Sequence, residues 1–276
     1  MKVYIIPNFS KEKTDLCLKN TYEKLISLGN EIIFSEEIQG DYNANVLSEK
    51  DAFITSDYVI VIGGDGSIIH EAKKAALYNK SVLGINCGRL GYLSGIEADE
   101  IDLLDTIQEG KYFIENRSMM VAEFESGQKK YKEEFLNDAV VSKGAISRII
   151  DVSVNFQESS VNYRADGVIV ATSTGSTAYS LSAGGPIVSP ELDVTIVTPI
   201  SAHSFQNKSI VLPTNEKLSI KNISPSNTEV YLSIDGEEVY KIDSESVVSF
   251  SKSPYQVKLI KIAKKSFFDT LANKIV

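Results

Sequence analysis

The chain has 276 residues, of which 43% are hydrophobic and 24% charged, and its 28 Lys and Arg against 37 Asp and Glu give a formal net charge of −9. This composition is typical of a globular protein with one large or two modest domains, and it excludes a disordered or fibrous chain. The negative charge disfavours nucleic acid and membrane surfaces as partners, because both require clustered Lys and Arg, whereas a small anionic ligand in a local basic pocket stays possible.

The numbers and positions of cysteine and histidine narrow the class of protein further. Cys17 and Cys87 are the two cysteines, and His70 and His203 are the two histidines. Two cysteines indicate reduced thiols in a cytoplasmic protein rather than a disulfide framework. The histidines lie far apart without the ligand spacing of a zinc site, so no protein-bound metal is predicted. No segment reaches the roughly 18 apolar residues of a membrane span.

The first third of the chain alternates predicted strands and helices. A helix over 11–28, with Ser10 as its N-cap, follows the first apolar run, and a helix over 67–78 buries Ile68, Ile69, Ala72, Ala75 and Ala76. The run at 58–62 is apolar at every position, as in a parallel strand covered on both faces. This alternation predicts an α/β layer. Its strands are expected at 3–6, 31–34, 58–62 and 82–85, and its last helix at 100–108.

The pattern changes near Gly110, after which short strands and polar turns dominate. This arrangement predicts a sandwich or a similar all-β domain, interrupted by one helix at 176–183 and followed by an amphipathic helix at 267–275. Strands are expected at 120–124, 151–156, 168–171, 194–198, 218–220, 230–234 and 247–250. We place the first domain at 1–112 and the second at 113–264.

The segment Gly63-Gly64-Asp65-Gly66-Ser67 lies between a buried strand and a helix. Open α/β sheets bind ligands at the carboxyl ends of their strands, and glycines there let a phosphate approach the free N–H groups of the helix N-terminus. Asp65 would serve as a general base or as a magnesium ligand, and the alternative is a glycine turn with a helix-capping Asp. The chain lacks G-x-x-x-x-G-K-[ST], and Ile69 replaces the last glycine of G-x-G-x-x-G, which disfavours a Walker-type site and a hydride-transferring dinucleotide enzyme.

A second polar segment, residues 172–186, follows the apolar run at 168–171 and is rich in Ser, Thr and Gly. Its hydroxyls suit ribose and phosphate oxygens, and Tyr179 could stack on a base or bond to it, although such a loop is more often a capped turn. Weaker signals are Asn137-Asp138, the segments 88–92 and 164–167, and Asp235-Gly236. The last is usually a hairpin turn.

Taken in order, these motifs resemble the NAD kinase family. Residues 63–67 resemble its GGDG[ST] motif, Asn137-Asp138 its N[ED] motif, 88–93 its G-x-LG[FY]-L segment, and 164–167 with 172–186 its glycine- and hydroxyl-rich block. GGDG alone is shared with lipid kinases and phosphofructokinase-like enzymes, whereas the 172–186 block is more particular. The resemblance covers most of the chain. It implies a Rossmann-like N-terminal α/β domain with the GGDG loop, a C-terminal β-sandwich-like NAD-binding domain, a site between them, and a C-terminal helix (265–276) that packs back on the first domain.

The resemblance also implies residue roles. Asp65 would be the catalytic carboxylate that activates the 2′-hydroxyl of the adenosine ribose of NAD, and Arg164 and Lys208 would contact phosphates. Tyr92 would lie near the adenine, Asp166 near the nicotinamide and Asp235 near the reacting ribose. The full set implied for NAD is Gly64, Gly66, Tyr92, Asn137, Asp138, Arg164, Asp166, Thr174, Thr177, Ala178, Tyr179, Ser182 and Asp235.

The sequence departs from the family pattern at two places. Ser173 stands where proline is common, which changes backbone stiffness more than chemistry. The stretch 203–208 matches the family only loosely, and its Lys208 offers a point charge in place of the planar fork of Arg. His203 is then expected to be structural.

The resemblance implies transfer of the γ-phosphoryl group of ATP to NAD, with Mg²⁺ carried by ATP. It also implies a homodimer or homotetramer. The alternatives are a GGDG-motif kinase with a lipid or sugar acceptor and a non-catalytic dinucleotide sensor. The sequence leaves open whether polyphosphate replaces ATP, whether NADH is accepted and whether NADPH inhibits.

Overall fold

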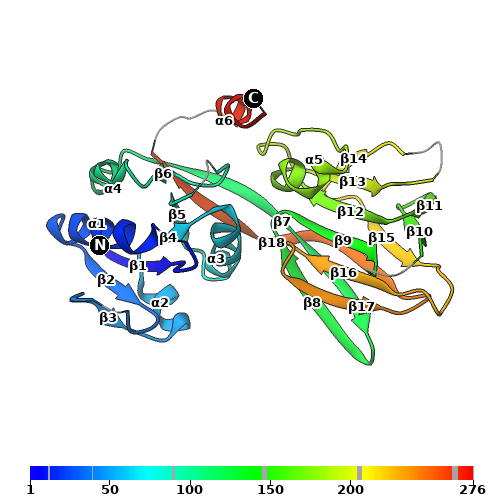
Figure 1. Ribbon diagram of the computed structural model, residues 1–276, viewed down its shortest axis with the longest axis horizontal. Helices are drawn as coiled ribbons and strands as arrows, with labels where there is room; N and C mark the ends of the chain where they lie inside the picture. Colours follow the sequence, from blue (N-terminus) through cyan, green and yellow to red (C-terminus); the bar gives the residue numbers. More distant parts are fainter. Residues whose placement is uncertain are drawn as a thin grey trace. The chain divides into compact units, whose positions relative to one another are not determined.

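The computed structural model describes residues 1–11, 13–38, 40–88, 91–144, 148–203, 207–262 and 267–275. The chain divides into two compact units, one made of 1–116 with 255–276 and the other of 117–254. Two long strands, β7 (Phe113–Ser126) and β18 (Val247–Lys261), pair with each other, and each belongs partly to one unit and partly to the other (Figure 1).

The first unit contains a parallel sheet with strand order β3-β2-β1-β4-β5. Every residue of β4 is buried, as its unbroken apolar sequence predicts for a strand covered on both faces. Beyond β5 the sheet continues into the end of β18, with Lys258 opposite Ser81. The short strand β6 (Ile96–Glu97) also pairs with β5. The five parallel strands are β1 (Lys2–Pro7), β2 (Glu31–Phe34), β3 (Asn45–Val46), β4 (Tyr58–Gly63) and β5 (Ser81–Asn86).

The helices predicted at 11–28 and 67–78 are present, but each begins at a different residue than expected. Helix α3 (Asp65–Leu77) buries the five predicted residues, but it begins two residues earlier than expected. The prediction that Ser10 caps the first helix is wrong, because α1 (Thr14–Ser27) begins four residues later. The Ser10 N–H instead donates to Asn8 Oδ1, and the Thr14 hydroxyl donates to the Asn8 carbonyl. The other helices are α2 (Glu49–Thr55), η1 (Ile101–Leu103), α4 (Leu104–Gln108) and α6 (Phe267–Ile275).

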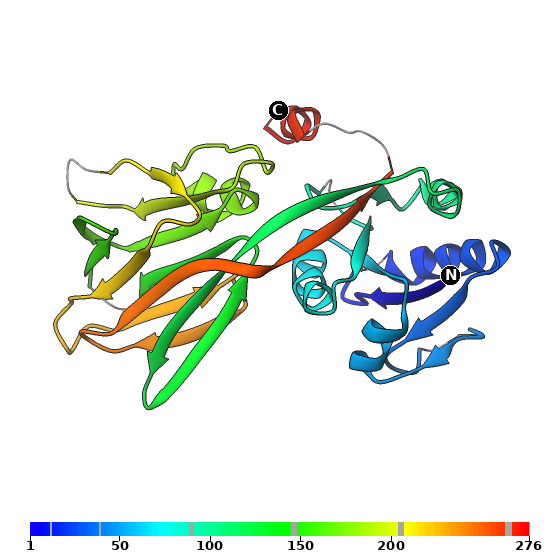
Figure 2. The ribbon, with the colours of Figure 1, turned by 180° about the vertical axis from the view of Figure 1, so that it is seen from behind.

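The second unit is a sandwich of antiparallel strands. One sheet has the order β14-β13-β12-β9-β16-β17, and the other layer is formed by β7, β8, β10, β11, β15 and the first part of β18 (Figure 2). Buried side chains of both layers form one core, with Val141 and Val170 from the first and Val152, Ile220 and Val248 from the second. Besides β7 and β18, the strands of this unit are β8 (Lys129–Phe135), β9 (Asp138–Lys143), β10 (Ile150–Asn155), β11 (Ser160–Ala165), β12 (Gly167–Thr172), β13 (Val194–Ile200), β14 (Ile210–Pro213), β15 (Leu218–Asn222), β16 (Val230–Ile234) and β17 (Glu238–Ile242).

The helix predicted at 176–183 is two short pieces, η2 (Thr174–Thr177) and α5 (Tyr179–Ser182). They are separated at Ala178, whose φ of −96° and ψ of −131° are not helical. The Ser176 hydroxyl donates to the Val188 carbonyl and accepts from the Val188 N–H, which joins the first piece to the chain beyond the second. The predicted class, an α/β unit followed by a β-rich sandwich, is confirmed. No helix in the described part of the chain is long and apolar enough to span a bilayer.

Candidate active site

The GGDG segment forms the turn from β4 into α3, where the topology places ligands in an open parallel sheet. Gly64 is the extended residue before the helix, and Asp65 is its first residue. A Cβ built on Gly64 or Gly66 would meet no atom within 4 Å. The backbone at the start of α3 is therefore open to an approaching group, and the positive end of the helix dipole favours an anion there.

The carboxylate of Asp65 is oriented by the backbone of a loop far along the chain. The Tyr92 N–H donates to Oδ2 at 2.9 Å, and the Leu93 N–H donates to Oδ1 at 3.1 Å. Asp65 is half-buried. Burial, and secondarily the nearby Asp65 carboxylate, raises the pKa of Tyr92. Two N–H donors thus fix the plane of the Asp65 carboxylate.

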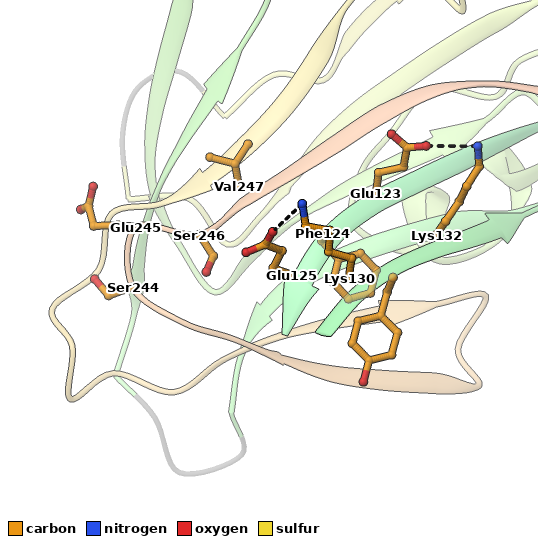
Figure 3. Close-up of a pocket in the computed structure, with 10 residues that line it drawn as sticks. Glu123, Phe124, Glu125, Lys130, Lys132, Ser244, Glu245, Ser246 and Val247 are labelled. Atoms are coloured by element: carbon orange, nitrogen blue, oxygen red, sulfur yellow. Dashed lines mark ion pairs between the residues drawn. The ribbon is translucent and has the colours of Figure 1, made fainter. Parts of the chain in front are cut away.

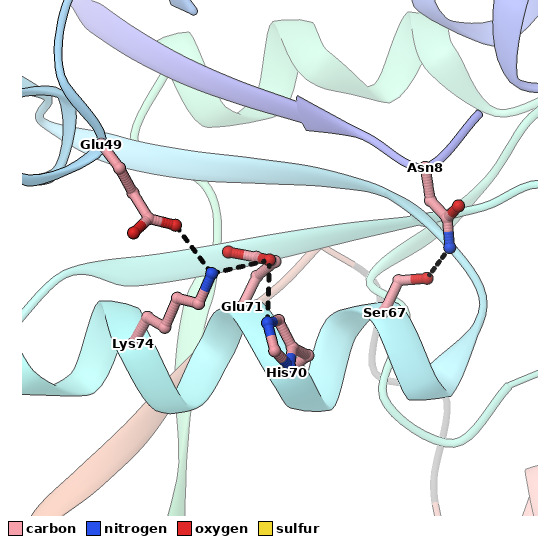
Figure 4. A network of polar contacts seen from close by, with 6 residues as sticks. All are labelled: Asn8, Glu49, Ser67, His70, Glu71 and Lys74. Atoms are coloured by element: carbon pink, nitrogen blue, oxygen red, sulfur yellow. Dashed lines mark hydrogen bonds and ion pairs between the residues drawn. The ribbon is translucent and has the colours of Figure 1, made fainter. Parts of the chain in front are cut away.

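The first turn of α3 is also fixed by the end of β1. Asn8 Nδ2 donates to Ser67 Oγ at 2.6 Å, and Figure 4 shows the two side chains meeting between strand and helix. A Cβ on Gly63 would lie 2.7 Å from Ser67 Oγ, so glycine is required at that point of the turn.

Further along α3 an ion-pair network joins this helix to α2. Lys74 Nζ contacts Glu49 at 2.7 Å and Glu71 at 3.3 Å, and His70 Nε2 is 3.6 Å from Glu71 (Figure 4). Burial raises the pKa of Glu71, while Lys74 opposes the rise. The network fixes the helix that carries Asp65, but it lies outside the predicted site set.

In the second unit, Asn137 and Asp138 lie where β8 turns into β9, and Asp235 fixes this turn. The Asp235 carboxylate accepts from the N–H groups of Leu136, Asn137 and Asp138 at 3.0, 2.7 and 3.1 Å. The Asp235 N–H donates to the Asp138 carbonyl at 2.8 Å. Asp235 and Gly236 form the hairpin between β16 and β17, and both have positive φ, 49° and 73°.

Asp138 is a buried carboxyl group, only 6% exposed. Burial, followed by the neighbouring Asp235 charge, raises its pKa from 3.8 to about 7, although the Tyr179 N–H stabilises its ionised form. Near neutral pH this side chain is therefore present both as a carboxylate and as a carboxylic acid. The two forms differ in hydrogen bonding, since only the acid can donate to a ligand oxygen or nitrogen.

The hydroxyl-rich block lies directly against the Asn137 turn. Thr172 Oγ1 donates to the Leu136 carbonyl at 2.5 Å and accepts from the Gly175 N–H at 3.1 Å. A Cβ on Gly175 would lie 2.8 Å from the Asn137 Cα and closer still to its carbonyl group, so only glycine permits this approach.

The block also contains hydroxyls that bond within the protein. Thr174 Oγ1 accepts from the buried Arg117 guanidinium at 3.4 Å, and Thr177 Oγ1 donates to the Thr174 carbonyl at 3.4 Å. In contrast, Ser182 is exposed and Tyr179 is 48% exposed. The structure therefore brings Asn137, Asp138, Asp235 and the segment 174–179 together. In the hydroxyl-rich block, the exposed side chains of Tyr179 and Ser182 are accessible to a ligand.

Comparison with known proteins decides the family. The model of the ATP-NAD kinase N-terminal domain matches residues 6–112, and that of the ATP-NAD kinase C-terminal domain matches residues 136–262. The chain belongs to the ATP-NAD kinase family. It is 37% identical over 279 residues to an NAD kinase of Caldanaerobacter subterraneus subsp. tengcongensis, which covers 99% of this chain and 98% of that protein. It is 42% identical over 222 residues to an NAD kinase of Symbiobacterium thermophilum, covering 79% and 78%.

Two solved structures share the fold of this ATP-NAD kinase family member. A yeast NADH kinase complexed with NADH superposes with a TM-score of 0.86 at 23% identity, covering all of this chain and 87% of that one. An NAD kinase from Archaeoglobus fulgidus in complex with ATP superposes with a TM-score of 0.75 at 24% identity, covering all of this chain and 98% of that one. The resemblance inferred from the motifs is confirmed.

Arg164 and Asp166, which the family resemblance also places at the dinucleotide, lie elsewhere on the second unit. On β12, Ala171 is opposite Asp138, whereas Gly167, next to Asp166, is opposite Ser142 at the far end of β9. At about 3.3 Å per residue, the five steps from Ala171 to Asp166 span roughly 16 Å. Asp166 forms an ion pair with Lys143 at 2.7 Å.

Arg164 is exposed and lines a cavity of about 820 Å³ together with Arg148, Asp151 and Glu229. The His203 N–H donates to the Arg164 carbonyl at 2.9 Å, and both His203 and Lys208 are exposed. The intervening residues 204–206 of the loosely matching stretch lie outside the described residues, as do Arg89 and Leu90 of the G-x-LG[FY]-L segment and residues 265, 266 and 276 of the predicted C-terminal helix.

A cavity of about 760 Å³ on the second unit contains none of the predicted site residues among its described lining (Figure 3). Two ion pairs border it, Glu123 with Lys132 at 3.1 Å and Glu125 with Lys130 at 3.4 Å. Each lysine thus has an acidic partner beside it, which disfavours an anionic substrate in this cavity.

Sequence reasoning missed the groups that orient the predicted carboxylates. The N–H groups of Tyr92 and Leu93 act through the backbone and leave no side-chain signal. Asp235 was expected near the reacting ribose, but its described contacts are with the backbone of 136–138. Its Asp-Gly hairpin signal was visible, and only the tertiary pairing of β16 with β9 shows what the side chain binds.

Proposed function

We propose that this protein is an NAD kinase that transfers the γ-phosphoryl group of ATP to the 2′-hydroxyl of the adenosine ribose of NAD. The observation that carries the proposal is the Asp65 carboxylate, fixed by two backbone N–H groups at the open N-terminus of α3. The family and its named relatives support the choice of acceptor.

In the proposed reaction the 2′-oxygen attacks the γ-phosphorus, the bond from phosphorus to the β–γ bridging oxygen breaks, and ADP leaves. The hydroxyl proton passes to Asp65, and such general-base assistance is worth about 10²–10⁴-fold. The Tyr92 and Leu93 N–H groups aim the accepting oxygen. The N–H groups near Gly64 and Gly66 are available to phosphoryl oxygens.

Asn137 and Asp138 would bind the dinucleotide, together with Ala178, Tyr179 and Ser182. The backbone of Asn137 and Asp138 is fixed by Asp235 in advance of binding, which lowers the entropy cost of ordering these two residues. Thr174 and Thr177 would contribute mainly by shaping this turn, because their hydroxyls already bond within the chain.

Mg²⁺ is proposed to arrive as part of the ATP substrate, where it neutralises charge on the transferring phosphates. Within the described residues there is no group of three or more His, Cys, Asp or Glu side chains arranged to bind a metal ion.

The test is a panel of acceptors and donors with the purified full chain, read by an NADP-specific coupled dehydrogenase and by transfer of labelled phosphate. We expect NADP from MgATP and NAD, a loss of at least about 100-fold in turnover for Asp65→Asn, and wild-type turnover for the exposed control Asp99→Asn. Labelled phosphate on a lipid or sugar with NAD inert would replace the proposal by another GGDG-motif kinase. Tight NAD binding without any product would indicate a dinucleotide sensor.

We also propose a homodimer or homotetramer in the cytoplasm. The roughly 16 Å between the ends of β12 supports assembly, because a neighbouring copy could present Arg164 and Asp166 to a dinucleotide bound at Asn137. Light scattering measures the assembly, and mixing Asp65→Asn with Asp166→Ala tests shared sites. Activity restored on mixing supports them, and an inactive mixture of assembled variants contradicts them. Cys17 and Cys87 are both buried and free, which agrees with a reducing compartment.

A further inference from the structure

The loop at residues 91–95 lies between Asp65 on one side and the end of β18 on the other. A Cβ on Gly91 would lie 3.0 Å from the Asp65 carboxyl carbon. A Cβ on Gly95 would lie 2.5 Å from the Ile260 carbonyl oxygen. Glycine at each end thus permits the loop to approach both neighbours closely.

Lys261, the last residue of β18, reaches the carbonyl side of this loop. Its Nζ lies 3.4 Å from the Tyr92 carbonyl oxygen, 3.1 Å from that of Leu93 and 2.6 Å from that of Ser94. The side chain is half-buried. An ammonium group has three N–H donors, and three carbonyl acceptors converge on it here.

The same backbone segment therefore contacts a cation and an anion. In the peptide group that joins Tyr92 to Leu93, the carbonyl oxygen accepts from Lys261 and the N–H donates to Asp65. This aligns the peptide dipole between the two charges, an arrangement in which each hydrogen bond strengthens the other. The pairing of β18 with β5, through Lys258 and Ser81, fixes the direction from which Lys261 approaches.

We propose that Lys261 is a positioning residue for the phosphoryl transfer: it fixes the 92–94 backbone so that the Tyr92 and Leu93 N–H groups aim the Asp65 carboxylate. The proposal rests on the proposed function. Without the ammonium, three carbonyls lose a common donor, the loop relaxes, and the carboxylate is no longer fixed. Binding of NAD should change little, because Asn137, Asp138, Ala178, Tyr179 and Ser182 belong to the other unit, and Lys261 contacts the backbone of Tyr92 rather than its side chain.

The test compares Lys261→Met, Lys261→Gln and Lys261→Arg with the control Lys258→Met in the full chain. Lys258 is on the same strand, and its Nζ contacts Asn79 rather than the loop. For Lys261→Met and Lys261→Gln we expect kcat to fall about 10–100-fold with the KM for NAD within about twofold, since a misplaced catalytic group lowers turnover rather than binding. Lys261→Arg, which keeps charge and donors, should restore kcat to within about threefold, and Lys258→Met should match the wild type.

Amide hydrogen exchange at residues 92 and 93 supplies a readout that does not depend on activity. Exchange there should accelerate in Lys261→Met and Lys261→Gln, while β4 amides stay as slow as in the wild type. Unchanged exchange together with unchanged kcat overturns the proposal, as does a raised KM at constant kcat. If the wild type makes no NADP, the proposed function fails, whereas faster loop exchange would still show that Lys261 fixes this backbone. If Lys261→Met does not fold, Lys261→Gln and Lys261→Arg decide the outcome.

Discussion

Replacing Asp235 by Asn tests how the turn at Asn137 is fixed. One carboxylate oxygen accepts from the Asn137 and Asp138 N–H groups, and the other accepts from the Leu136 N–H. The amide oxygen of Asn can preserve the first pair, but its NH₂ group would then face the Leu136 N–H, donor against donor. Asn tolerates the φ of 49° at this position, so backbone strain does not confuse the result.

The magnitude follows from the lost acceptor. Leu136 is fully buried, and an unsatisfied buried N–H costs about 1–3 kcal/mol. Removing the Asp235 charge also removes one of the causes that raise the pKa of Asp138, so this pKa should fall below about 7. Asp235→Asn should therefore lower the free energy of unfolding by about 1–3 kcal/mol and shift the titration of Asp138 to lower pH.

Urea unfolding measures the first effect, and carboxyl-carbon NMR titration of Asp138 measures the second. Glu238→Gln is the control, because it removes an exposed charge from the same hairpin. An unfolding free energy within about 0.5 kcal/mol of the wild type, together with an unmoved Asp138 titration, would refute the role assigned to Asp235.

Three further predictions concern the fixed parts of both units. The Asp138 pKa is raised in the folded chain, so the contribution of Asp138 to stability is complete below pH 3.8 and is lost as pH rises through about 7. Asp138→Asn should therefore reduce the fall in the free energy of unfolding between pH 4 and 8. An unaltered dependence of this free energy on pH would contradict the prediction. Gly175→Ala should destabilise by about 1–3 kcal/mol and weaken NAD binding in calorimetry, since its methyl group would meet the Asn137 backbone; wild-type stability and affinity would count against that close approach. A double-mutant cycle of Asn8→Ala with Ser67→Ala, followed by thermal unfolding, should give a coupling of about 0.5–1.5 kcal/mol, and additive effects would show that their 2.6 Å contact does not stabilise α3.

Helices and strands whose hydrophobic pattern and flanking turn residues are both visible in the sequence could be predicted closely. Strand β16 matches the predicted Val230–Ile234, because buried and half-exposed residues alternate and an Asp-Gly turn follows. Helix α2 was not predicted, since only Ala52 and Phe53 of its seven residues are buried. Strand β7 was predicted as 120–124 but extends over 14 residues, because its first four are exposed or half-exposed and gain their pairing from distant strands.

In the candidate site, too, the residues with a local sequence pattern could be predicted and the tertiary contacts could not. Asp65 and Asn137-Asp138 could be predicted because a polar side chain after an apolar strand is visible in the sequence. The contacts that orient them could not, because they join residues 27 and 98 positions apart through backbone N–H groups. For the Ser/Thr block the sequence left a ligand surface and a capped turn open, and in the structure the hydroxyls of Thr172 and Ser176 bond to backbone of the same unit.

The first unit is assembled from both ends of the chain, 1–116 and 255–276, while the second is continuous from 117 to 254. During synthesis, the second unit can therefore complete its fold before the first. Strand β5 cannot pair with β18, and the loop that orients Asp65 cannot contact Lys261, until residues 255–261 have been synthesised. The order of synthesis thus makes the Lys261 contact with the 92–94 loop a late event, so that a chain truncated before Lys261 lacks this contact.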